Sequence, residues 1–355
     1  MSGSITLFIG PTKAGKTTEL QRQYNRLSIK YDKICAINCS KMSCSFFKSY
    51  NLESILDEIL EFDIILIDNL HLIDDSLEFL PKLADQFGKT IICAGLDTNE
   101  QRKPFKNVID LIPKCEKVQK FSAFCTIKND TSPAIFSKLV DKKYIPLSRQ
   151  AYLNKESVGF LHVITGPMFS GKTTELLRQI EQMQSIGKSI LTVNYNKDVR
   201  YDKSAKICSH NNQSIETKIA VDDLETILEP EILSIYDVIV IDEVQFMKNA
   251  LAVIINLVDN HQKTVIVSGL DGDFLQNPFG DVCSLIAQAD KLTRLNAICK
   301  LSKEFKNACF SKRISKETAK ELIGAEDTYV AVCRQLYNLP DEQFYKLIQA
   351  QQLSK

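Results

Sequence analysis

The stretch Gly166-Pro167-Met168-Phe169-Ser170-Gly171-Lys172-Thr173 fits the pattern G-x-x-x-x-G-K-[ST], and residues 10–17, GPTKAGKT, fit it a second time. Loops of this kind turn successive backbone N–H groups toward a phosphate, and the helix that follows adds its positive end. Each copy follows a short apolar run, residues 5–9 or 160–164, and precedes a stretch with helical periodicity. This context predicts a phosphate-binding loop in each half of the chain.

Beyond the two loops, apolar runs continue to alternate with helical stretches. Second strands are predicted at 33–38 and 188–194, third strands at 63–68 and 236–242, and further strands at 90–94 and 264–268. Such alternation is typical of a buried, mostly parallel sheet covered by helices. We therefore predict an α/β fold of two tandem P-loop NTPase (RecA-like) domains, residues 1–153 and 154–355, divided where Asn154-Lys155-Glu156-Ser157 interrupts the pattern.

The two halves differ in length at defined places. The offset is 156 residues between the loop lysines, 174 between Asp68 and Asp242, and 185 between Tyr144 and Tyr329 of a shared Tyr-x-x-x-(Ser/Cys)-Arg-Gln-x-Tyr pattern. The second half thus has 18 additional residues (174 − 156) before its acidic strand and 11 more (185 − 174) before its tyrosine. Because the core elements match, these additions are expected in loops, where α/β proteins place substrate contacts.

Composition narrows the class of protein. The 355 residues suffice for two ordinary domains, and the 44 Lys and Arg balance the 44 Asp and Glu, which gives no indication of a nucleic-acid or membrane partner. No apolar run approaches the about 20 residues that span a bilayer, and the first residues do not resemble an export signal. The eleven scattered cysteines are then expected to be reduced thiols of a cytoplasmic protein.

The second half carries a full set of residues for triphosphate chemistry. Lys172 is expected to reach the β- and γ-phosphates and Thr173 to bind Mg²⁺. Asp242 ends a predicted strand where an acidic residue would hold the metal and its waters. The adjacent Glu243 could accept the proton of an attacking hydroxyl group. By spacing alone, the same Asp-Glu pair could equally activate water in an NTPase.

Further motifs make the second half similar to a known family. They are Tyr195-x-Lys197-Asp198-x-Arg200-Tyr201, Ile241-Asp242-Glu243-x-Gln245-Phe246, Leu270-Asp271-Gly272-x-Phe274, Pro278-Phe279-Gly280, Ser311-Lys312-Arg313, Ile323-Gly324-Ala325-x-Asp327-x-Tyr329 and Val332-Cys333-Arg334. Together with the glycine loop, they make residues 159–338 resemble the type II (human-cytosolic-like) thymidine kinases. The resemblance implies transfer of the ATP γ-phosphate to the 5′-hydroxyl of thymidine, with deoxyuridine as a second candidate acceptor.

The resemblance also implies roles for individual residues. Glu243 would be the general base, Arg313 would steady the transferred charge, and Thr173 and Asp242 would hold Mg²⁺. The implied ATP-binding residues are Gly166, Pro167, Met168, Phe169, Ser170, Gly171, Lys172, Thr173, Thr174, Asp198 and Arg200. The implied nucleoside-binding residues are Met168, Phe246, Leu270, Phe274, Phe279 and Tyr329. A "lasso" loop at 313–333, within a lasso region of about 294–338, would close on the base.

One family feature is incomplete in this chain. The family anchors its lasso with zinc held by two C-x-x-C pairs. Here Cys299 and Cys333 match the first cysteine of each pair, but Ser302 and Leu336 stand where the second cysteines would be. Leucine cannot bind a metal, and two thiolates do not complete a tetrahedral zinc site. We therefore predict no structural zinc, with packing around Leu336 in its place.

The first half is predicted to be a degenerate copy. It has Asn69 at the position of the base, and an amide cannot accept the proton. Its lasso segment is shortened between residues 137 and 144, and its loop residues Gly10, Gly15, Lys16 and Thr17 leave ATP binding open. Because the family's enzymes are homotetramers, a chain dimer could imitate a tetramer, with the first half as an interface partner.

Two other functions compete with thymidine phosphorylation. A different P-loop kinase or NTPase would consume ATP without thymidine, but it would not explain the lasso-like C-terminal motifs. A non-catalytic nucleotide-binding or assembly protein would not need Lys172, Asp242, Glu243 and Tyr329 together.

Overall fold

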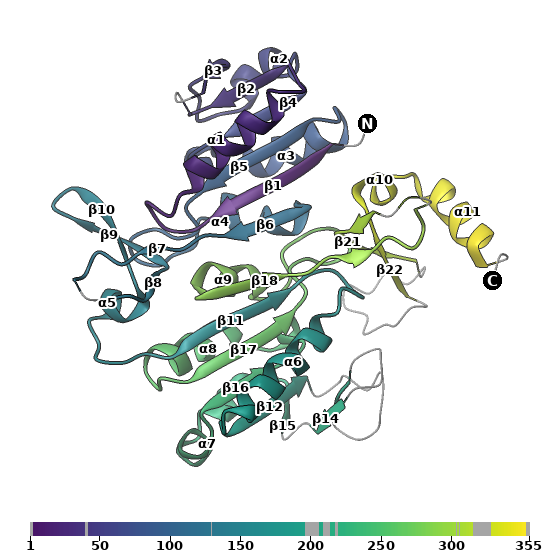
Figure 1. Ribbon diagram of the computed structural model, residues 1–355. Helices are drawn as coiled ribbons and strands as arrows, with labels where there is room; N and C mark the ends of the chain where they lie inside the picture. Colours follow the sequence, from purple (N-terminus) through teal and green to yellow (C-terminus); the bar gives the residue numbers. More distant parts are fainter. Residues whose placement is uncertain are drawn as a thin grey trace. The chain divides into compact units, whose positions relative to one another are not determined.

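The chain divides into two compact units, residues 1–156 and 157–355 (Figure 1). The structure is a computed structural model that describes residues 3–39, 42–128, 130–195, 206–208, 214–216, 219–302, 304, 306–314 and 328–352. Each unit is described by itself below.

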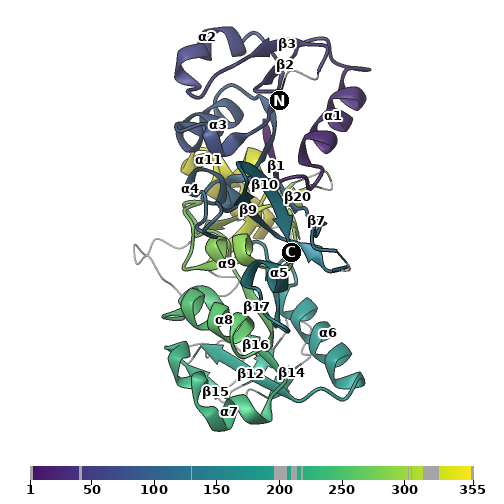
Figure 2. The same ribbon diagram turned by 90° about the vertical axis from the view of Figure 1, so that its left-hand side faces the viewer.

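The first unit is built on a six-stranded sheet in the order β3-β2-β4-β5-β1-β6, with every neighbouring pair parallel. Its strands are β1 (Ser4–Ile9), β2 (Ile34–Ile37), β3 (Ser45–Phe47), β4 (Ile64–Ile67), β5 (Thr90–Gly95) and β6 (Lys117–Lys120). Helices α1 (Lys16–Leu27) and α3 (Ser76–Asp85) cover opposite faces of this sheet (Figure 2). Both faces are therefore buried, which explains why β2 and β4 are apolar throughout rather than alternating.

The second unit repeats this sheet in the order β15-β12-β16-β17-β11-β18, again wholly parallel. Its strands are β11 (Phe160–Thr165), β12 (Ile190–Tyr195), β15 (Ile219–Val221), β16 (Val238–Ile241), β17 (Thr264–Gly269) and β18 (Lys291–Arg294). Helix α6 (Lys172–Ser185) lies on one face and α8 (Ala250–Asp259) on the other (Figure 2). The predicted α/β class with two tandem parallel sheets is confirmed.

Each unit ends in an antiparallel pair with the same register. In the first unit β9 (Phe136–Val140) pairs with β10 (Lys143–Leu147), and in the second β21 (Phe310–Arg313) pairs with β22 (Tyr329–Val332). Tyr144 lies opposite Leu139, as Tyr329 lies opposite Arg313. The first pair closes directly through residues 141 and 142, both with positive φ. The corresponding connection in the second unit, residues 315–327, contains most of the predicted lasso and lies outside the described residues.

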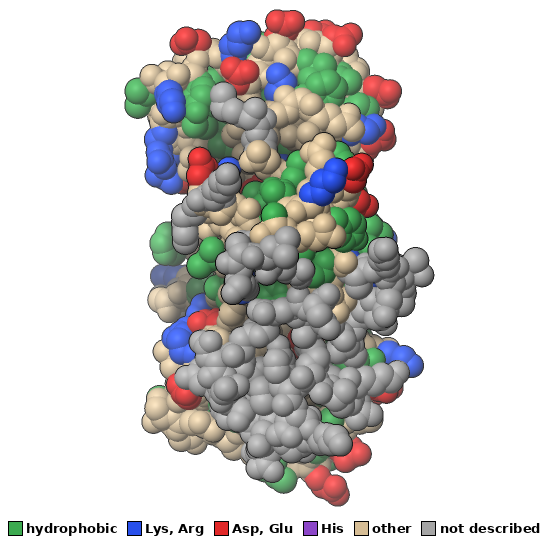
Figure 3. Space-filling view, turned by 90° about the vertical axis from the view of Figure 1, so that its right-hand side faces the viewer, with side chains coloured by type: hydrophobic (Ala, Val, Ile, Leu, Met, Phe, Trp, Pro, Cys, Tyr) green, Lys and Arg blue, Asp and Glu red, His purple; other side chains and the backbone are tan. Residues whose placement is uncertain are grey.

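Shorter elements complete the two units. They are α2 (Leu56–Ile59), α4 (Lys106–Ile109), β7 (Ala123–Phe124), β8 (Pro133–Ala134), α5 (Arg149–Leu153), β13 (Lys206–Cys208), β14 (Ser214–Glu216), α7 (Pro230–Ile235), α9 (Val282–Gln288), β19 (Ala297–Ile298), β20 (Asn307–Ala308), α10 (Arg334–Tyr337) and α11 (Asp341–Gln352), with one-turn 3₁₀ helices at Glu53–Ile55, Leu70–Leu72, Ile112–Lys114, Leu224–Leu228 and Val244–Phe246. None of the described helices has the length and apolar character of a membrane span. Acidic and basic side chains lie side by side on the face of the first unit shown in Figure 3, as the balanced composition leads one to expect.

Candidate active site

The glycine loop of the second unit connects β11 to α6 and is shaped by two glycines. Gly171 has φ 84° and Gly166 has φ 147°, and a Cβ on Gly166 would lie 2.3 Å from the carbonyl oxygen of Leu295. Only glycine fits both constraints. Within this loop the Lys172 ammonium donates to the carbonyl oxygen of Pro167 at 2.9 Å, so its charge is held at the point where a phosphate would bind.

A hydroxyl and a carboxylate suited to Mg²⁺ lie next to this loop. Thr173 Oγ1 is 3.3 Å from Oδ2 of Asp242, which follows the last residue of β16. The other oxygen of Asp242, Oδ1, accepts from Ser268 Oγ at 2.7 Å and from the backbone N–H of Glu243 at 3.0 Å. The carboxylate is thereby fixed with one oxygen toward Thr173. A Thr hydroxyl and one carboxylate leave several positions to water and phosphate, which is how Mg²⁺ is usually bound beside a triphosphate.

The carboxylate of Glu243 accepts a hydrogen bond from Gln245, a residue that the sequence motifs did not predict to be part of the site. Gln245 donates from Nε2 to Glu243 Oε2 at 2.6 Å, while its Oε1 accepts from the backbone N–H of Leu270 at 3.1 Å. Gln245 is buried, and a Cβ on Gly269 would lie 2.7 Å from its Oε1. The amide side chain therefore bridges the base position and the loop after β17.

The backbone at Glu243 is unusual for a glutamate. It has φ 55° and ψ 38°, in the left-handed region, immediately before the 3₁₀ turn Val244–Phe246. Residues other than glycine and asparagine enter this region at a cost of about 1–3 kcal/mol, and such positions are concentrated at functional sites.

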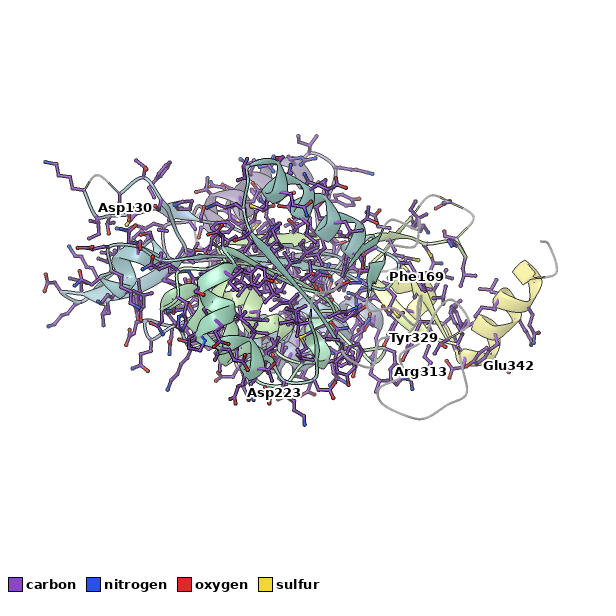
Figure 4. The ribbon with its side chains drawn as sticks, turned by 90° about the horizontal axis from the view of Figure 1, so that it is seen from below. Asp130, Phe169, Asp223, Arg313, Tyr329 and Glu342 are labelled. Atoms are coloured by element: carbon purple, nitrogen blue, oxygen red, sulfur yellow. The ribbon has the colours of Figure 1, made fainter. Side chains whose placement is uncertain are left out.

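Three of the predicted residues form a compact group, in which Arg313 and Tyr329 of the β21–β22 pair meet Phe274 from the loop after β17. The Arg313 guanidinium donates from Nη2 to the Tyr329 hydroxyl at 2.7 Å and lies 3.8 Å from the ring centroid of Phe274. Both Arg313 and Tyr329 are buried. Figure 4 shows Arg313 and Tyr329 at the same end of the second unit as Phe169 of the glycine loop, with Asp223 elsewhere.

Strand β21 is tied to the glycine loop by a second residue that sequence reasoning missed. Ser311 Oγ accepts from the backbone N–H of Met168 at 2.9 Å. Ser311 and Arg313 are two residues apart on a strand, so both side chains are on one face of it. The guanidinium thus lies on the side of β21 that contacts the phosphate loop.

The predicted nucleoside-binding residues are intermediate in exposure rather than core. Phe246 stacks on Tyr195 with centroids 5.2 Å apart and makes an edge contact with Phe279 at 5.2 Å. The half-buried members are Met168, Phe246, Leu270, Phe274 and Phe279, whereas Tyr329 is buried. Half-buried aromatic rings at the carboxyl ends of parallel strands are suited to holding a planar base.

A buried ion pair supports the same edge of the sheet. Arg294 Nε lies 2.7 Å from Asp271 Oδ2, with side-chain exposures of 3% and 6%. The sequence motifs include Asp271 but do not identify Arg294 as its partner, because the two residues belong to different elements 23 residues apart.

The first unit reproduces most of this geometry with different chemistry. Lys16 donates to the carbonyl oxygens of Gly10 and Pro11, and Thr17 Oγ1 donates to Asp68 Oδ2 at 2.7 Å. Asn69 has φ 56° and ψ 40°, the conformation of Glu243.

Two further contacts of the first unit have counterparts in the second unit. Ser137 Oγ accepts from the backbone N–H of Thr12 at 2.8 Å, as Ser311 does from Met168. His71 Nδ1 accepts from the backbone N–H of Leu96 at 3.3 Å, in the place of Gln245. Burial, with the nearby charge of Lys16, lowers the pKa of His71 to about 4, so the ring is neutral and can accept.

The acceptor side of the first unit differs more. Leu139 stands where Arg313 stands, and Glu100, which replaces Phe274, accepts from the Tyr144 hydroxyl at 3.0 Å. The Arg313 guanidinium stacked on Phe274 in the second unit is thus replaced in the first unit by the aliphatic Leu139 and the anionic Glu100.

The residues at the positions of the family's zinc ligands do not fit a zinc site. Among the described residues, no group of three or more His, Cys, Asp or Glu could hold a metal ion. Leu336 packs against an apolar cluster that includes Cys299, and the neighbouring Cys299 thiol, together with backbone N–H groups, lowers the pKa of Cys333. The absence of structural zinc stays a prediction. Two ATP-binding residues implied by the resemblance, Asp198 and Arg200, lie outside the described residues.

Comparison with known proteins places this geometry in one family. The family model described as "Thymidine kinase" matches residues 3–145 and again 159–337. Similar proteins include the thymidine kinase of Myxoma virus (strain Uriarra), 41% identical over 181 residues, and thymidine kinase 1 of Dictyostelium discoideum, 41% over 184 residues. Thymidine kinase a of Arabidopsis thaliana is 40% identical over 188 residues. These alignments cover 50%, 51% and 52% of this chain and 96%, 78% and 77% of the respective relatives.

Proposed function

The chain belongs to the thymidine kinase family and is an ATP-dependent nucleoside kinase, and we propose that its second unit, residues 157–355, transfers the ATP γ-phosphate to the 5′-hydroxyl of thymidine. Both units match the family model, so the tandem arrangement itself does not decide which unit is active. The second unit is favoured because it alone has a carboxylate at the base position.

Binding of the triphosphate is assigned to the glycine loop, and Lys172 would neutralise charge on the β- and γ-phosphates. Thr173 and Asp242 would hold Mg²⁺, which when bound would neutralise the charge that develops on the phosphates. Asp242 is already oriented by Ser268 and the backbone of Glu243, so little reorganisation is needed. Phosphoryl transfer of this kind depends mainly on positioning and electrostatics.

Glu243 is assigned the proton of the 5′-hydroxyl. Its Oε2 accepts from Gln245, and a carboxylate oriented in this way is suited to accept the proton of the sugar hydroxyl. Arg313, on the loop-facing side of β21, is assigned to the charge on the phosphoryl group in transit. Its guanidinium is pre-organised by the ring of Phe274 and the hydroxyl of Tyr329, so it can act without first being ordered.

The thymine ring is assigned to the half-buried rings of Phe246 and Phe279 and the buried ring of Tyr329, with Met168, Leu270 and Phe274 as the other proposed pocket residues. Such a pocket recognises a planar base by stacking, and the pyrimidine methyl group adds only about 1–3 kcal/mol. Deoxyuridine is therefore expected as a weaker acceptor. Backbone of the lasso, residues 313–333, would supply the polar contacts to the base edge.

The observation that carries the proposal is the hydrogen-bonded Glu243 carboxylate beside the Thr173–Asp242 pair. The test is ATP consumption with and without thymidine, with the product identified by chromatography, for the wild type and Glu243→Gln. Thymidine-dependent formation of the monophosphate that collapses in Glu243→Gln supports the proposal. ATP hydrolysis that does not need thymidine would favour an NTPase in which the same carboxylate activates water.

The first unit is proposed to bind Mg²⁺-nucleotide without turning it over. Support comes from Lys16, Thr17 and Asp68, which repeat the geometry of the second unit. Asn69 and Leu139 stand at the positions of the base and the arginine. With a nonhydrolysable ATP analogue, we expect two sites in the wild type, one in Lys172→Ala, and none in the Lys16→Ala/Lys172→Ala double variant.

We further propose that two chains associate, so that four kinase-like units imitate the family's tetramer. Light scattering that gives a monomer at assay concentration would contradict this. We propose that the reaction takes place in the cytosol, where the eleven cysteines would remain reduced thiols.

A further inference from the structure

The C-terminal helix α11 lies beyond the part of the chain that matches the family model, which ends at residue 337. Helices at a chain end usually fray unless a buried side chain holds them. In α11 that side chain is Phe344, which is fully buried. Figure 1 shows α11 alongside β21 and β22.

Phe344 belongs to the apolar core of the β19–β22 region, which we name the C-terminal cluster. The buried members of this cluster are Ala297, Cys299, Ala308, Cys309, Phe310, Ala331, Val332 and Phe344. All but Phe344 come from the hairpin strands and the turns beside them. The tail therefore supplies the aromatic ring that completes the core beneath both hairpins.

Lys312 of β21 also connects the C-terminal cluster to α11 through its charged ammonium group. Lys312 Nζ lies 4.2 Å from the ring centroid of Phe344 and donates to the carbonyl oxygens of Tyr337 at 2.8 Å and Leu339 at 3.1 Å. It is also 3.7 Å from Asp341 Oδ1. A partly desolvated ammonium over an aromatic face is attracted by about 0.5–2 kcal/mol.

The first unit offers an internal comparison without a tail. Its Lys138, at the position of Lys312, reaches the ring of Tyr152 at 5.6 Å and is exposed. The Lys312 side chain is only 12% exposed. Tyr152 and Tyr337 occupy equivalent positions, because each donates its hydroxyl hydrogen to the backbone carbonyl at the corresponding position. The difference is therefore attributed to the segment after Tyr337, which places Leu339, Asp341 and Phe344 around Lys312.

Strand alternation links the tail to the proposed active site. Lys312 points to the tail, while its neighbours Ser311 and Arg313 point to the opposite face. Those two neighbours make the bonds to Met168 of the glycine loop and to Tyr329. A shift of β21 on the tail side is therefore transmitted directly to the face that holds Arg313.

We infer that α11 is a positioning element of the active site, in which Phe344, through Lys312, fixes strand β21 and hence Arg313 and Tyr329. The inference rests on the proposed function, in that Arg313 and Tyr329 are taken to serve the nucleoside. Phe344 is a positioning residue and contacts neither substrate.

The experiment compares full-length Phe344→Ala with Leu347→Ala, a matched truncation on the exposed side of the same helix. For Phe344→Ala we expect kcat/KM for thymidine to fall about tenfold or more, because small displacements of positioning groups have effects of this size. The KM for ATP should change less than about twofold, because Lys172 and Thr173 belong to α6 and Asp242 follows β16, so none of them lies on β21. Leu347→Ala should match the wild type, and Phe344→Leu should recover most of the loss.

Hydrogen exchange gives a readout that does not depend on turnover. In Phe344→Ala, but not in Leu347→Ala, peptides covering 307–314 should exchange faster. Lys312→Met removes the hydrogen bonds to the carbonyl oxygens of Tyr337 and Leu339 and keeps the apolar stem. It should speed the exchange of the same peptides to a smaller extent, and it provides a test even if Phe344→Ala folds poorly. If the wild type did not phosphorylate thymidine, the proposed function would be wrong. Hydrogen exchange of peptides 307–314 would still show whether Phe344 anchors β21. Equal exchange and equal kinetics for the Phe344 and Leu347 variants would overturn the inference.

Discussion

Glu243 and Asn69 adopt the same left-handed backbone conformation after matching strands, with φ/ψ of 55°/38° and 56°/40°. Asparagine tolerates this conformation, whereas a glutamate is strained in it. The unit that we propose to be active therefore carries a local strain that its non-catalytic copy has lost together with the carboxylate. Strain retained beside the Thr173–Asp242 pair, which we propose to bind Mg²⁺, is what a stability–function trade-off predicts.

Replacing Gln245 tests whether it positions the base. Gln245→Leu removes the donor to Glu243 and the acceptor for the Leu270 N–H. We expect kcat to fall about tenfold or more with little change in the KM for ATP, since only the base is displaced. The loss of a buried hydrogen-bond partner should also lower the free energy of unfolding by about 1–3 kcal/mol. Steady-state kinetics and urea unfolding measure the two effects, and an unchanged kcat would rule out the positioning role.

Arg313→Leu makes the second unit resemble the first, which has Leu139. If the guanidinium steadies the transferred phosphoryl group, kcat should fall about 10²–10³-fold. Arg313→Lys should not restore it, because an ammonium cannot stack flat on Phe274 while donating to Tyr329. The matched control, Leu139→Arg, should leave turnover unchanged. Recovery of full kcat in the lysine variant would show that charge alone is needed.

The buried pairs Arg294–Asp271 and Lys120–Asp97 offer a test of structural equivalence. Because the first unit uses lysine, Arg294→Lys should keep the fold and most of the stability. Arg294→Met should cost about 3–5 kcal/mol, because it leaves the Asp271 carboxylate buried and unpaired. Chemical denaturation compares the two variants, and an equal loss in both would mean that the pairs are not interchangeable.

Nucleotide binding to the first unit should depend on pH. Burial lowers the pKa of Lys16 to about 8, against the opposing influence of Asp97 and Asp68. The charged form that attracts phosphate is present below this pH and is lost above it. In Lys172→Ala, where binding reports on the first unit, affinity for a Mg²⁺-bound ATP analogue should be constant near neutrality and weaken by up to about tenfold per unit above pH 8. Equilibrium titration between about pH 7 and pH 9.5 measures this, and an affinity that rises with pH would contradict it.

Prediction from the sequence succeeded where a pattern is local and failed where contacts are distant. The two glycine loops and the apolar strands ending in Asp68 and Asp242 predict both sheets, because buried parallel strands are apolar throughout. The bridge made by Gln245 and the bond from Met168 to Ser311 could not be found this way, since each depends on the precise approach of separate elements. The burial of Phe344 could not be predicted for a similar reason, because two adjacent aromatic residues in a mostly polar C-terminal segment predict only a surface helix.

Glu243→Asn tests most directly whether the carboxylate of Glu243 is required for the activity proposed for the second unit. This change gives the second unit the residue that the first unit already has, in the same backbone conformation. We predict that thymidine-dependent turnover falls about 10²–10⁴-fold while the midpoint of thermal unfolding does not decrease. Turnover close to that of the wild type would contradict the assignment of Glu243 as the base. A large loss of stability would contradict the account of strain at this position.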